Sequence, residues 1–164
     1  NVNLRVMERE DVDFLAEHLN DIDCMGEYWS DFEQRSKSEW MKQFDNPSSL
    51  DVLHEGKRFI IQKKDGTKIG DIHHFLDRPH MLMEIACWLV PSERRKGYAT
   101  EATQLMVDYL FLSKELARIQ AIVDVRHIAS QRVLEKAGFQ REGTMRDESF
   151  DRGEWRDFYL YSIL

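Results

Sequence analysis

The segment of the sequence best suited to chemistry runs from Pro91 to Ala102. Here an apolar run ends, a basic loop with one glycine follows, and an amphipathic helix is predicted to begin at once. The first N–H groups of a helix lack partners within it, and the helix dipole favours negative charge there, so this junction could bind phosphate. Gly97 would let a ligand approach closely, while Arg94, Arg95 and Lys96 would add positive charge. The alternative is an ordinary basic loop, because the spacing fits neither a P-loop nor G-x-G-x-x-G.

A second motif, from Val123 to Phe139, strengthens the interpretation of the first. Its closing residues, Ser130 to Phe139, read S-x-R-V-L-E-K-A-G-F, and the basic loop reads R-x-x-G-x-A from Arg94. Together these two motifs resemble the GNAT acetyltransferase superfamily. The chain is further similar to the RimJ/RimL-like branch, the ribosomal-protein N-terminal acetyltransferases, at Leu4-Arg5, Glu84 to Leu89, Gly97 to Ala102, Gly143 to Arg146 and Asp157 to Ser162.

The resemblance implies a GNAT fold with acetyl-CoA as co-substrate. The loop from Arg94 to Thr100 would cradle the pyrophosphate of acetyl-CoA, and pantetheine would lie between two splayed parallel strands, residues 81–90 and 119–125. The free backbone of Leu89 and Val90 would pair with pantetheine as an added strand would, and an N–H near Leu89 would stabilise the oxyanion. The implied contacts with acetyl-CoA are Leu89, Val90, Arg94, Arg95, Lys96, Gly97, Tyr98, Ala99, Thr100, His127 and Ser130.

Transfer of an acetyl group to an amine needs a proton acceptor for the amine and a hydrogen-bond donor for the leaving thiolate. Since no nucleophilic side chain is required, direct attack in a ternary complex is the simplest mechanism. The resemblance implies Ser130 as the donor and Glu84 as the proton acceptor, with Asp147 or Glu148 as the alternative. Ser130 could instead be an ordinary serine at a helix start, and each of the acids could instead be a solvated side chain. His127 stands where the family usually has asparagine, and it could contact acetyl-CoA or titrate near the site.

The acceptor side is less well defined by the sequence. Tyr28 and Trp29, flanked by Glu27 and Asp31, could bind a cationic amine through cation–π and ionic contacts, or could anchor their loop to the core. Glu84 would face the same amine. The acceptor could be a protein N-terminal α-amine, a polyamine or another small amine of the antibiotic type. A non-catalytic acyl-CoA-binding module is the alternative of another class, although the two catalytic candidates argue against it.

The chain of 164 residues fits one domain, 1–164, which can bury a core without disulfides or a structural metal. Its net charge of −7 argues against non-specific binding to nucleic acid or an anionic membrane. No apolar run is long enough to span a membrane and no signal peptide is evident, so we expect a cytoplasmic protein. Two cysteines and scattered histidines form no metal pattern, so no metal is expected. A homodimer is possible, because relatives in this family are often dimers.

The hydrophobic pattern predicts an α+β domain, with a mixed sheet of about seven strands and helices on both faces. An Asp-Gly turn at Asp65-Gly66 marks a hairpin, and a later strand–helix–strand crossover should be right-handed. Residues 21–31 are expected to be irregular. Strands are predicted at Val2–Met7, Arg58–Gln62, Lys68–Leu76, Met81–Val90, Ile119–Val125, Phe139–Arg146 and Trp155–Ile163, and helices near Val12–Leu19, Ser36–Phe44, Gly97–Ser113 and Ile128–Ala137.

Overall fold

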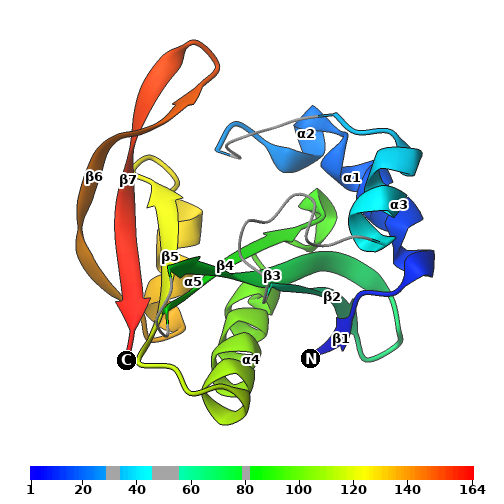
Figure 1. Ribbon diagram of the computed structural model, residues 1–164, viewed down its shortest axis with the longest axis horizontal. Helices are drawn as coiled ribbons and strands as arrows, with labels where there is room; N and C mark the ends of the chain where they lie inside the picture. The colour runs from blue at the N-terminus through cyan, green and yellow to red at the C-terminus, as the bar shows by residue number, and fades with distance from the viewer. Residues whose placement is uncertain (29–33, 46–55, 79–81) are drawn as a thin grey trace.

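A seven-stranded mixed sheet forms the centre of the protein (Figure 1). The computed structural model describes residues 1–28, 34–45, 56–78 and 82–164. Over these residues the strands follow the order β1-β2-β3-β4-β5-β7-β6, and the only parallel pair among them is β4 with β5. This arrangement confirms the predicted α+β fold. The strands are β1 (Val2–Val6), β2 (Lys57–Lys63), β3 (Lys68–Arg78), β4 (Leu82–Leu89), β5 (Arg118–Asp124), β6 (Gln140–Asp151) and β7 (Glu154–Ile163).

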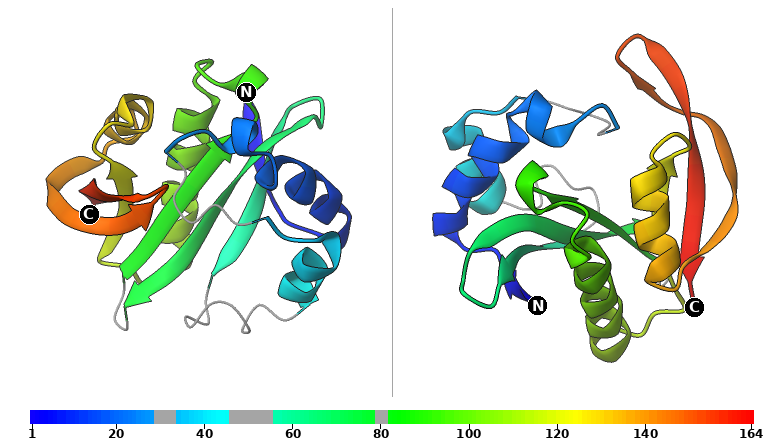
Figure 2. Two further views of the ribbon diagram at one scale, coloured as in Figure 1. Left: turned by 90° about the horizontal axis from the view of Figure 1, so that it is seen from above. Right: turned by 180° about the vertical axis from the view of Figure 1, so that it is seen from behind.

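Helices cover both faces of the sheet, as predicted (Figure 2). One face carries α1 (Val12–Leu19), α2 (Ile22–Met25) and α3 (Lys37–Asp45), and the other carries α4 (Tyr98–Ser113) and α5 (Ile128–Lys136). Short 3-10 turns, η1 (Arg9–Asp11) and η3 (Pro91–Glu93), precede α1 and α4. In the described parts of the chain, no helix has the length and apolar character needed to cross a membrane.

Helix α2 corrects the prediction of an irregular segment over residues 21–31. The side chain of Asp21 accepts hydrogen bonds from the N–H groups of Asp23 at 2.9 Å and Cys24 at 3.3 Å. A capping carboxylate satisfies donors that a helix start leaves unpaired, so one turn forms without an extended apolar stripe. The helix ends at Gly26, which has a positive φ of 76°.

Strand β4 is buried on both faces because alternate side chains enter two different cores. Met83, Ile85 and Leu89 pack into the core between the sheet and the two helices α4 and α5. Trp88 packs into the second core with residues of α1, α2 and α3. A strand with helices on both sides is therefore expected to be mostly apolar, as its sequence is.

The parallel strands β4 and β5 pair only at their beginnings. Their register joins Leu82 to Arg118, Met83 to Ile119 and Glu84 to Gln120, and no later pair joins the described residues of the two strands. Beyond Gln120, β5 stays paired with β7 as far as Asp124. The strands thus part as predicted, and we call the space between residues 85–90 and 121–125 the β4/β5 gap. Its closed end lies at Glu84 and its open end at the ends of the two strands.

The hairpin of β6 and β7 is longer than predicted, because β6 continues past Arg146 to Asp151. A bulge interrupts the pairing between Met145 and Ser149. Asp147 has a positive φ of 50° there, and its N–H donates to Oδ1 of Asp157 at 2.9 Å. The side-chain acceptor replaces the missing ladder partner, so the strand resumes after the bulge.

Gly70 tests how closely β3 must approach β4 at the edge of the gap. It lies opposite Leu89, and an added Cβ would stand 2.1 Å from the backbone oxygen of Trp88. We expect Gly70→Ala to lower the free energy of unfolding by roughly 1–3 kcal/mol, because two strands must move apart. Gly143→Ala is the matched control, since an added Cβ would meet no atom within 4 Å. Equal urea-unfolding curves for the two variants would contradict the expectation.

Candidate functional site

Helix α4 begins with an anion-binding geometry. Its N-cap is Gly97, with φ of 86° and no side-chain capping bond, and the first helical hydrogen bond runs from Glu101 N–H to the Gly97 oxygen at 3.1 Å. The N–H groups of Tyr98, Ala99 and Thr100 therefore have no acceptor within the helix. The loop fits a pyrophosphate group, because a ligand can reach these donors past a residue that has no side chain.

The three basic residues before Gly97 have different surroundings. Arg94 Nε donates to the Leu89 oxygen at 2.9 Å, and its Nη2 donates to the oxygen of Cys24. Lys96 Nζ lies 3.1 Å from a carboxylate oxygen of Glu93. Arg95 is exposed and has a positive φ of 61°. Of the three predicted phosphate ligands, Arg95 therefore has the guanidinium most open to an approaching anion.

The backbone along β4 offers fewer free groups than predicted. The N–H of Val90 donates to Ile69 at 2.8 Å and its oxygen accepts from Glu93 at 3.0 Å, so the expectation of a free backbone fails at Val90. Successive residues of a strand direct their backbone groups to opposite sides, so the N–H groups of Cys87 and Leu89 point toward the gap. The role of the Leu89 N–H as donor to an oxyanion stays a prediction.

Glu84 stands at the closed end of the gap. It belongs to the last residue pair between β4 and β5, and its side chain is 9% exposed. Its Oε2 accepts a hydrogen bond from Gln120 Nε2 at 2.8 Å. By strand alternation, this carboxylate lies on the same face as Trp88, the face covered by α1, α2 and α3. The structure therefore places a buried acid at the closed end of the gap.

Two other predicted site residues lie at the open end of the gap, at the start of α5. His127 is the N-cap of this helix, and its ring stacks on Tyr28 with 4.6 Å between ring centroids. Burial lowers the pKa of His127, although the nearby carboxylate of Asp124 opposes this effect. The imidazole is therefore mainly neutral at pH 7. Ser130 lies half-buried in the first turn, and its hydroxyl has no hydrogen-bond partner among the described residues.

The candidate acids of β6 also belong to the open end. The bulge of β6 is held by Asp157, whose backbone oxygen accepts from the N–H of Val125 at 3.1 Å. This contact puts the exposed side chains of Asp147 and Glu148 at the level where β5 leads into α5. The structure therefore places Ser130 and these two acids at the open end of the gap, away from Glu84. No motif spacing signals this division, because it depends on where β4 and β5 stop pairing.

The predicted aromatic pair is only partly described, because Trp29 lies outside the described residues. Two arginines near Tyr28 escaped the sequence analysis. Arg152 Nη2 donates to the Gly26 oxygen at 2.8 Å, and Arg156 Nη1 donates to the Glu27 oxygen at 2.8 Å. Basic residues beside a hairpin turn are common on protein surfaces, so no sequence signal marked them.

The described part of the chain offers no site for metal or thiol chemistry. No group of three or more His, Cys, Asp or Glu residues is arranged there to hold a metal ion. Cys24 and Cys87 are free thiols. Burial raises the pKa of Cys87, followed by a smaller effect of Asp71, so its thiolate is strongly disfavoured.

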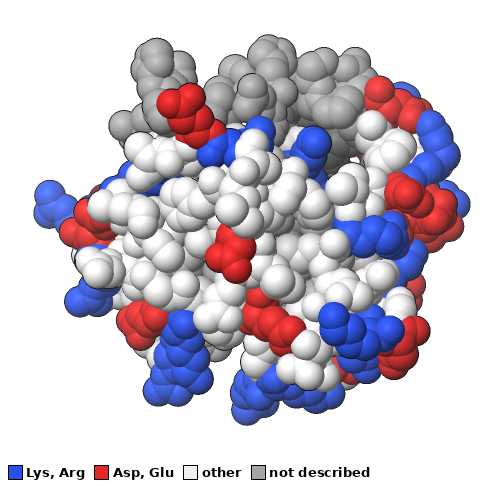
Figure 3. Space-filling view, turned by 90° about the horizontal axis from the view of Figure 1, so that it is seen from below, with Lys and Arg blue, Asp and Glu red and all other residues white. Residues whose placement is uncertain are grey.

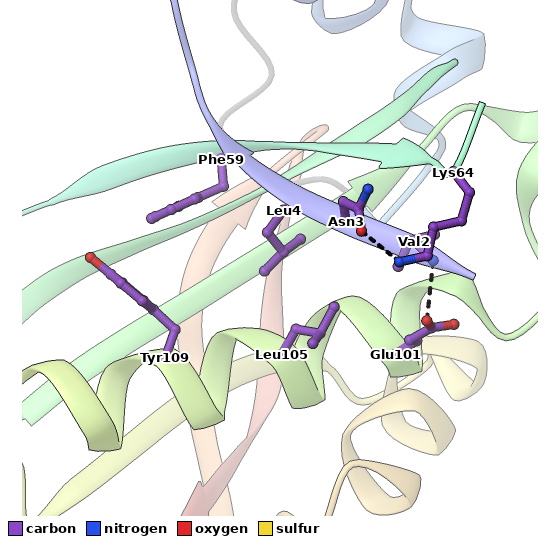
Figure 4. A pocket seen from close by; sticks show the side chains of 8 residues that line it. All are labelled: Val2, Asn3, Leu4, Phe59, Lys64, Glu101, Leu105 and Tyr109. Atoms are coloured by element: carbon purple, nitrogen blue, oxygen red, sulfur yellow. Dashed lines mark hydrogen bonds between the residues drawn. The ribbon is translucent and has the colours of Figure 1, made fainter. Parts of the chain in front are cut away.

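A separate pocket of about 500 Å³ lies between β1 and α4 (Figure 4). Strands β2, β3 and β4 stand between β1 and the gap, so this pocket is not part of the site described above. No sequence pattern predicted it. The pocket is lined by Val2, Asn3, Leu4, Phe59, Lys64, Glu101, Leu105 and Tyr109.

On the face shown in Figure 3, basic side chains alternate with acidic ones instead of forming one basic patch.

The chain is similar to known acetyltransferases in sequence and in fold. Residues 1–140 match the family described as Acetyltransferase (GNAT) domain. The chain is 34% identical to the uncharacterized N-acetyltransferase p20 of Bacillus licheniformis, over 99% of this chain and 92% of p20. It is 27% identical to spermidine N(1)-acetyltransferase of Escherichia coli, over 96% of this chain and 82% of that protein. The crystal structure of spermidine N-acetyltransferase from Vibrio cholerae with CoA and spermine shares the fold, with a TM-score of 0.85, 23% identity, and coverage of 99% and 94%.

Gly97 allows a direct test of the anion-binding loop. We expect Gly97→Asp to abolish measurable binding of acetyl-CoA in calorimetry, because a carboxylate would repel the pyrophosphate and block the N–H groups of α4. Gly66→Asp is the matched control: its φ is 87°, the φ of Gly97 is 86°, and an added Cβ meets no atom within 4 Å at either position. Unchanged affinity in Gly97→Asp would remove the loop from the site.

Proposed function

Because the chain belongs to the GNAT acetyltransferase family, we propose that it acetylates the N-terminal α-amine of a peptide or protein, by direct attack in a ternary complex. The chain is an N-acetyltransferase, with acetyl-CoA as the acetyl donor and an amine as the acceptor. The alternative of a non-catalytic acyl-CoA-binding module is therefore not retained. The observation that carries the proposal is the position of Glu84, at the closed end of the gap on the face covered by α1, α2 and α3.

Acetyl-CoA supplies the acetyl thioester, and the chain's own groups orient the reactants and move the proton. The α4 N-terminus holds the phosphates, and Leu89 N–H donates to the thioester oxygen. Glu84 takes the proton from the attacking amine through a chain of ordered water molecules. Ser130 donates to the leaving sulfur, which requires the sulfur to lie toward the open end. Five residues of β4, roughly 16 Å of extended chain, separate Leu89 from Glu84, and the water molecules must span this distance.

The charges on the acceptor face favour an amine with a single positive charge. Asp71 is fully buried and lies 2.5 Å from Arg58, and Asp124 lies 2.9 Å from Arg126. Burial alone would raise the pKa of both carboxyls, but these guanidinium groups hold both values below the ordinary range. Both acids are therefore ionised and already paired at neutral pH. The additional ammonium groups of a polyamine would have to compete with arginine for these carboxylates.

The protonation of the amine favours the same class of acceptor. An α-amine has a pKa near ~8, so about a tenth of it is neutral at pH 7. A lysine-like alkylamine has a pKa near ~10.4, which leaves roughly one molecule in 2,500 neutral. A single carboxylate acting as proton acceptor is therefore more readily sufficient for an α-amine than for an alkylamine.

A polyamine is the second candidate acceptor. The specific observation in its favour is the similarity, over nearly the whole chain, to a spermidine N(1)-acetyltransferase. The exposed acids Glu27, Asp147 and Glu148 could attract the outer ammonium groups of such a ligand. The RimJ/RimL-like residues, in turn, support the α-amine. A homodimer stays a prediction, to be checked by light scattering.

Thiol release from acetyl-CoA with three matched acceptors tests the proposal. The acceptors are a lysine-free peptide with a free N-terminus, an N-terminally blocked peptide with one lysine, and spermidine. We expect the first to give the highest kcat/KM at pH 7, by about tenfold or more, because more of its amine is neutral. A preference for spermidine would establish the second candidate instead. No turnover with any of them, despite tight acetyl-CoA binding, would contradict both acceptor proposals.

The pH profile of Glu84→Gln tests the proton acceptor. We expect kcat/KM at pH 7 to fall roughly 10²- to 10⁴-fold, and to recover partly as pH rises, because the amine then loses its proton to water. Ser130→Ala should lower kcat by roughly ten- to a thousandfold at every pH, because a hydroxyl group does not titrate in this range.

Glu148→Gln is the control for the pH experiment. It removes an exposed carboxylate at the open end and should leave the profile unchanged. A pH-dependent loss in Glu148→Gln, with none in Glu84→Gln, would move the proton acceptor to the open end beside Ser130. A pH-independent loss in Glu84→Gln would show that Glu84 only supports the structure.

A further inference from the structure

Arg94 links the anion-binding loop to the acceptor side of the molecule. It follows the 3-10 turn η3, and its Nε donates back to the oxygen of Leu89, the last residue of β4, at 2.9 Å. The other end of the same guanidinium donates to the oxygen of Cys24, at the end of α2. Both acceptors are backbone carbonyls of the protein. A planar fork of donors held in this way is committed to the protein, and it fixes the distance between β4 and α2.

The residues that follow Cys24 are held from the opposite side of the gap. Arg152 and Arg156 of the β6–β7 hairpin donate to the backbone oxygens of Gly26 and Glu27, both at 2.8 Å. The ring of Tyr28 then stacks on His127 at the start of α5. Three arginines and one ring contact thus hold four of the five residues from Cys24 to Tyr28. We call Cys24–Tyr28 the bridging segment.

The bridging segment spans the open end of the gap. Arg94 holds it on the β4 side, whereas His127 and the hairpin arginines hold it on the side of β5 and β7. Figure 1 shows the chain after α2 reaching from the α1–α3 layer toward β5 and the hairpin. This is the face on which Glu84 lies. An acceptor that enters from the open end on this face passes the bridging segment before it reaches Glu84.

We propose that Arg94 is a positioning residue for the acceptor, and that it is not a ligand of the acetyl-CoA phosphates. Arg94 holds the bridging segment against β4 at Leu89, the residue whose N–H faces the gap. The proposal rests on the proposed placement of acetyl-CoA in the β4/β5 gap. It also revises the expectation from the sequence, in which Arg94, Arg95 and Lys96 all face the pyrophosphate. The phosphate-binding role falls to the α4 N–H groups and to exposed Arg95.

Three variants separate the two roles. In Arg94→Met, we expect the KM for the best acceptor of the panel to rise roughly ten- to a hundredfold, because charge-assisted hydrogen bonds to two carbonyls are lost. The Kd for acetyl-CoA, measured by calorimetry, should stay within about twofold of the parent. Arg152→Met, at an exposed residue, should raise the acceptor KM in the same direction. Arg95→Asn, which tolerates the positive φ, should instead weaken acetyl-CoA binding by about tenfold.

The outcomes distinguish a wrong role for Arg94 from a wrong placement of acetyl-CoA. A Kd for acetyl-CoA that rises in Arg94→Met as in Arg95→Asn, with the acceptor KM unchanged, would make Arg94 a phosphate ligand and overturn the proposal. No change in either constant would overturn it as well. If Arg94→Met unfolds, Arg152→Met decides, and an unchanged acceptor KM there would count against the bridging segment. A cofactor affinity that is insensitive to Gly97→Asp and Arg95→Asn would contradict the proposed placement itself.

Discussion

The separation of β4 from β5 after Glu84 and Gln120 is the constraint on which the rest of the site depends. Backbone donors and acceptors that leave a sheet need other partners. Strand β5 stays paired with β7 along its other edge, and the guanidinium of Arg94 satisfies the Leu89 oxygen on the β4 side. The gap therefore has stable walls, and the N–H groups on its β4 side remain available to an extended ligand. Loop, helix starts and hairpin all take their positions from the two diverging strands.

Much of the fold was predictable because period and turn chemistry are local. The Asp65-Gly66 hairpin, the crossover helix α4 and the apolar strand β5 follow from residues within a few positions of one another. Two elements were not predictable in this way. Helix α2 depends on a cap at Asp21, with a single turn behind it. The outer half of β6 has no buried apolar side chain, so it has no apolar alternation to reveal it.

The site shows the opposite balance, because a motif names residue types and leaves their partners undetermined. Arg94, Arg95 and Lys96 are adjacent and equally basic, yet one contacts backbone carbonyls, one is exposed and one pairs with Glu93. The difference comes from Cys24, 70 positions away in the sequence. The separation of Glu84 from Ser130 is non-local in the same sense. Neither spacing nor composition contains this information, because it depends on contacts between residues far apart in the sequence, which form only in the folded chain.

The bulge of β6 has a consequence for how copies of the chain meet. Strand β6 is an edge of the sheet, and a long exposed edge can recruit a strand from another molecule. At Asp147 the backbone turns into the left-handed region, and the following ladder shifts by two residues relative to β7. A foreign strand could match the register on one side of the bulge but not on both. The bulge thereby protects β6 against uncontrolled extension into fibrils, and a dimer that forms through this edge cannot continue the sheet along the whole strand.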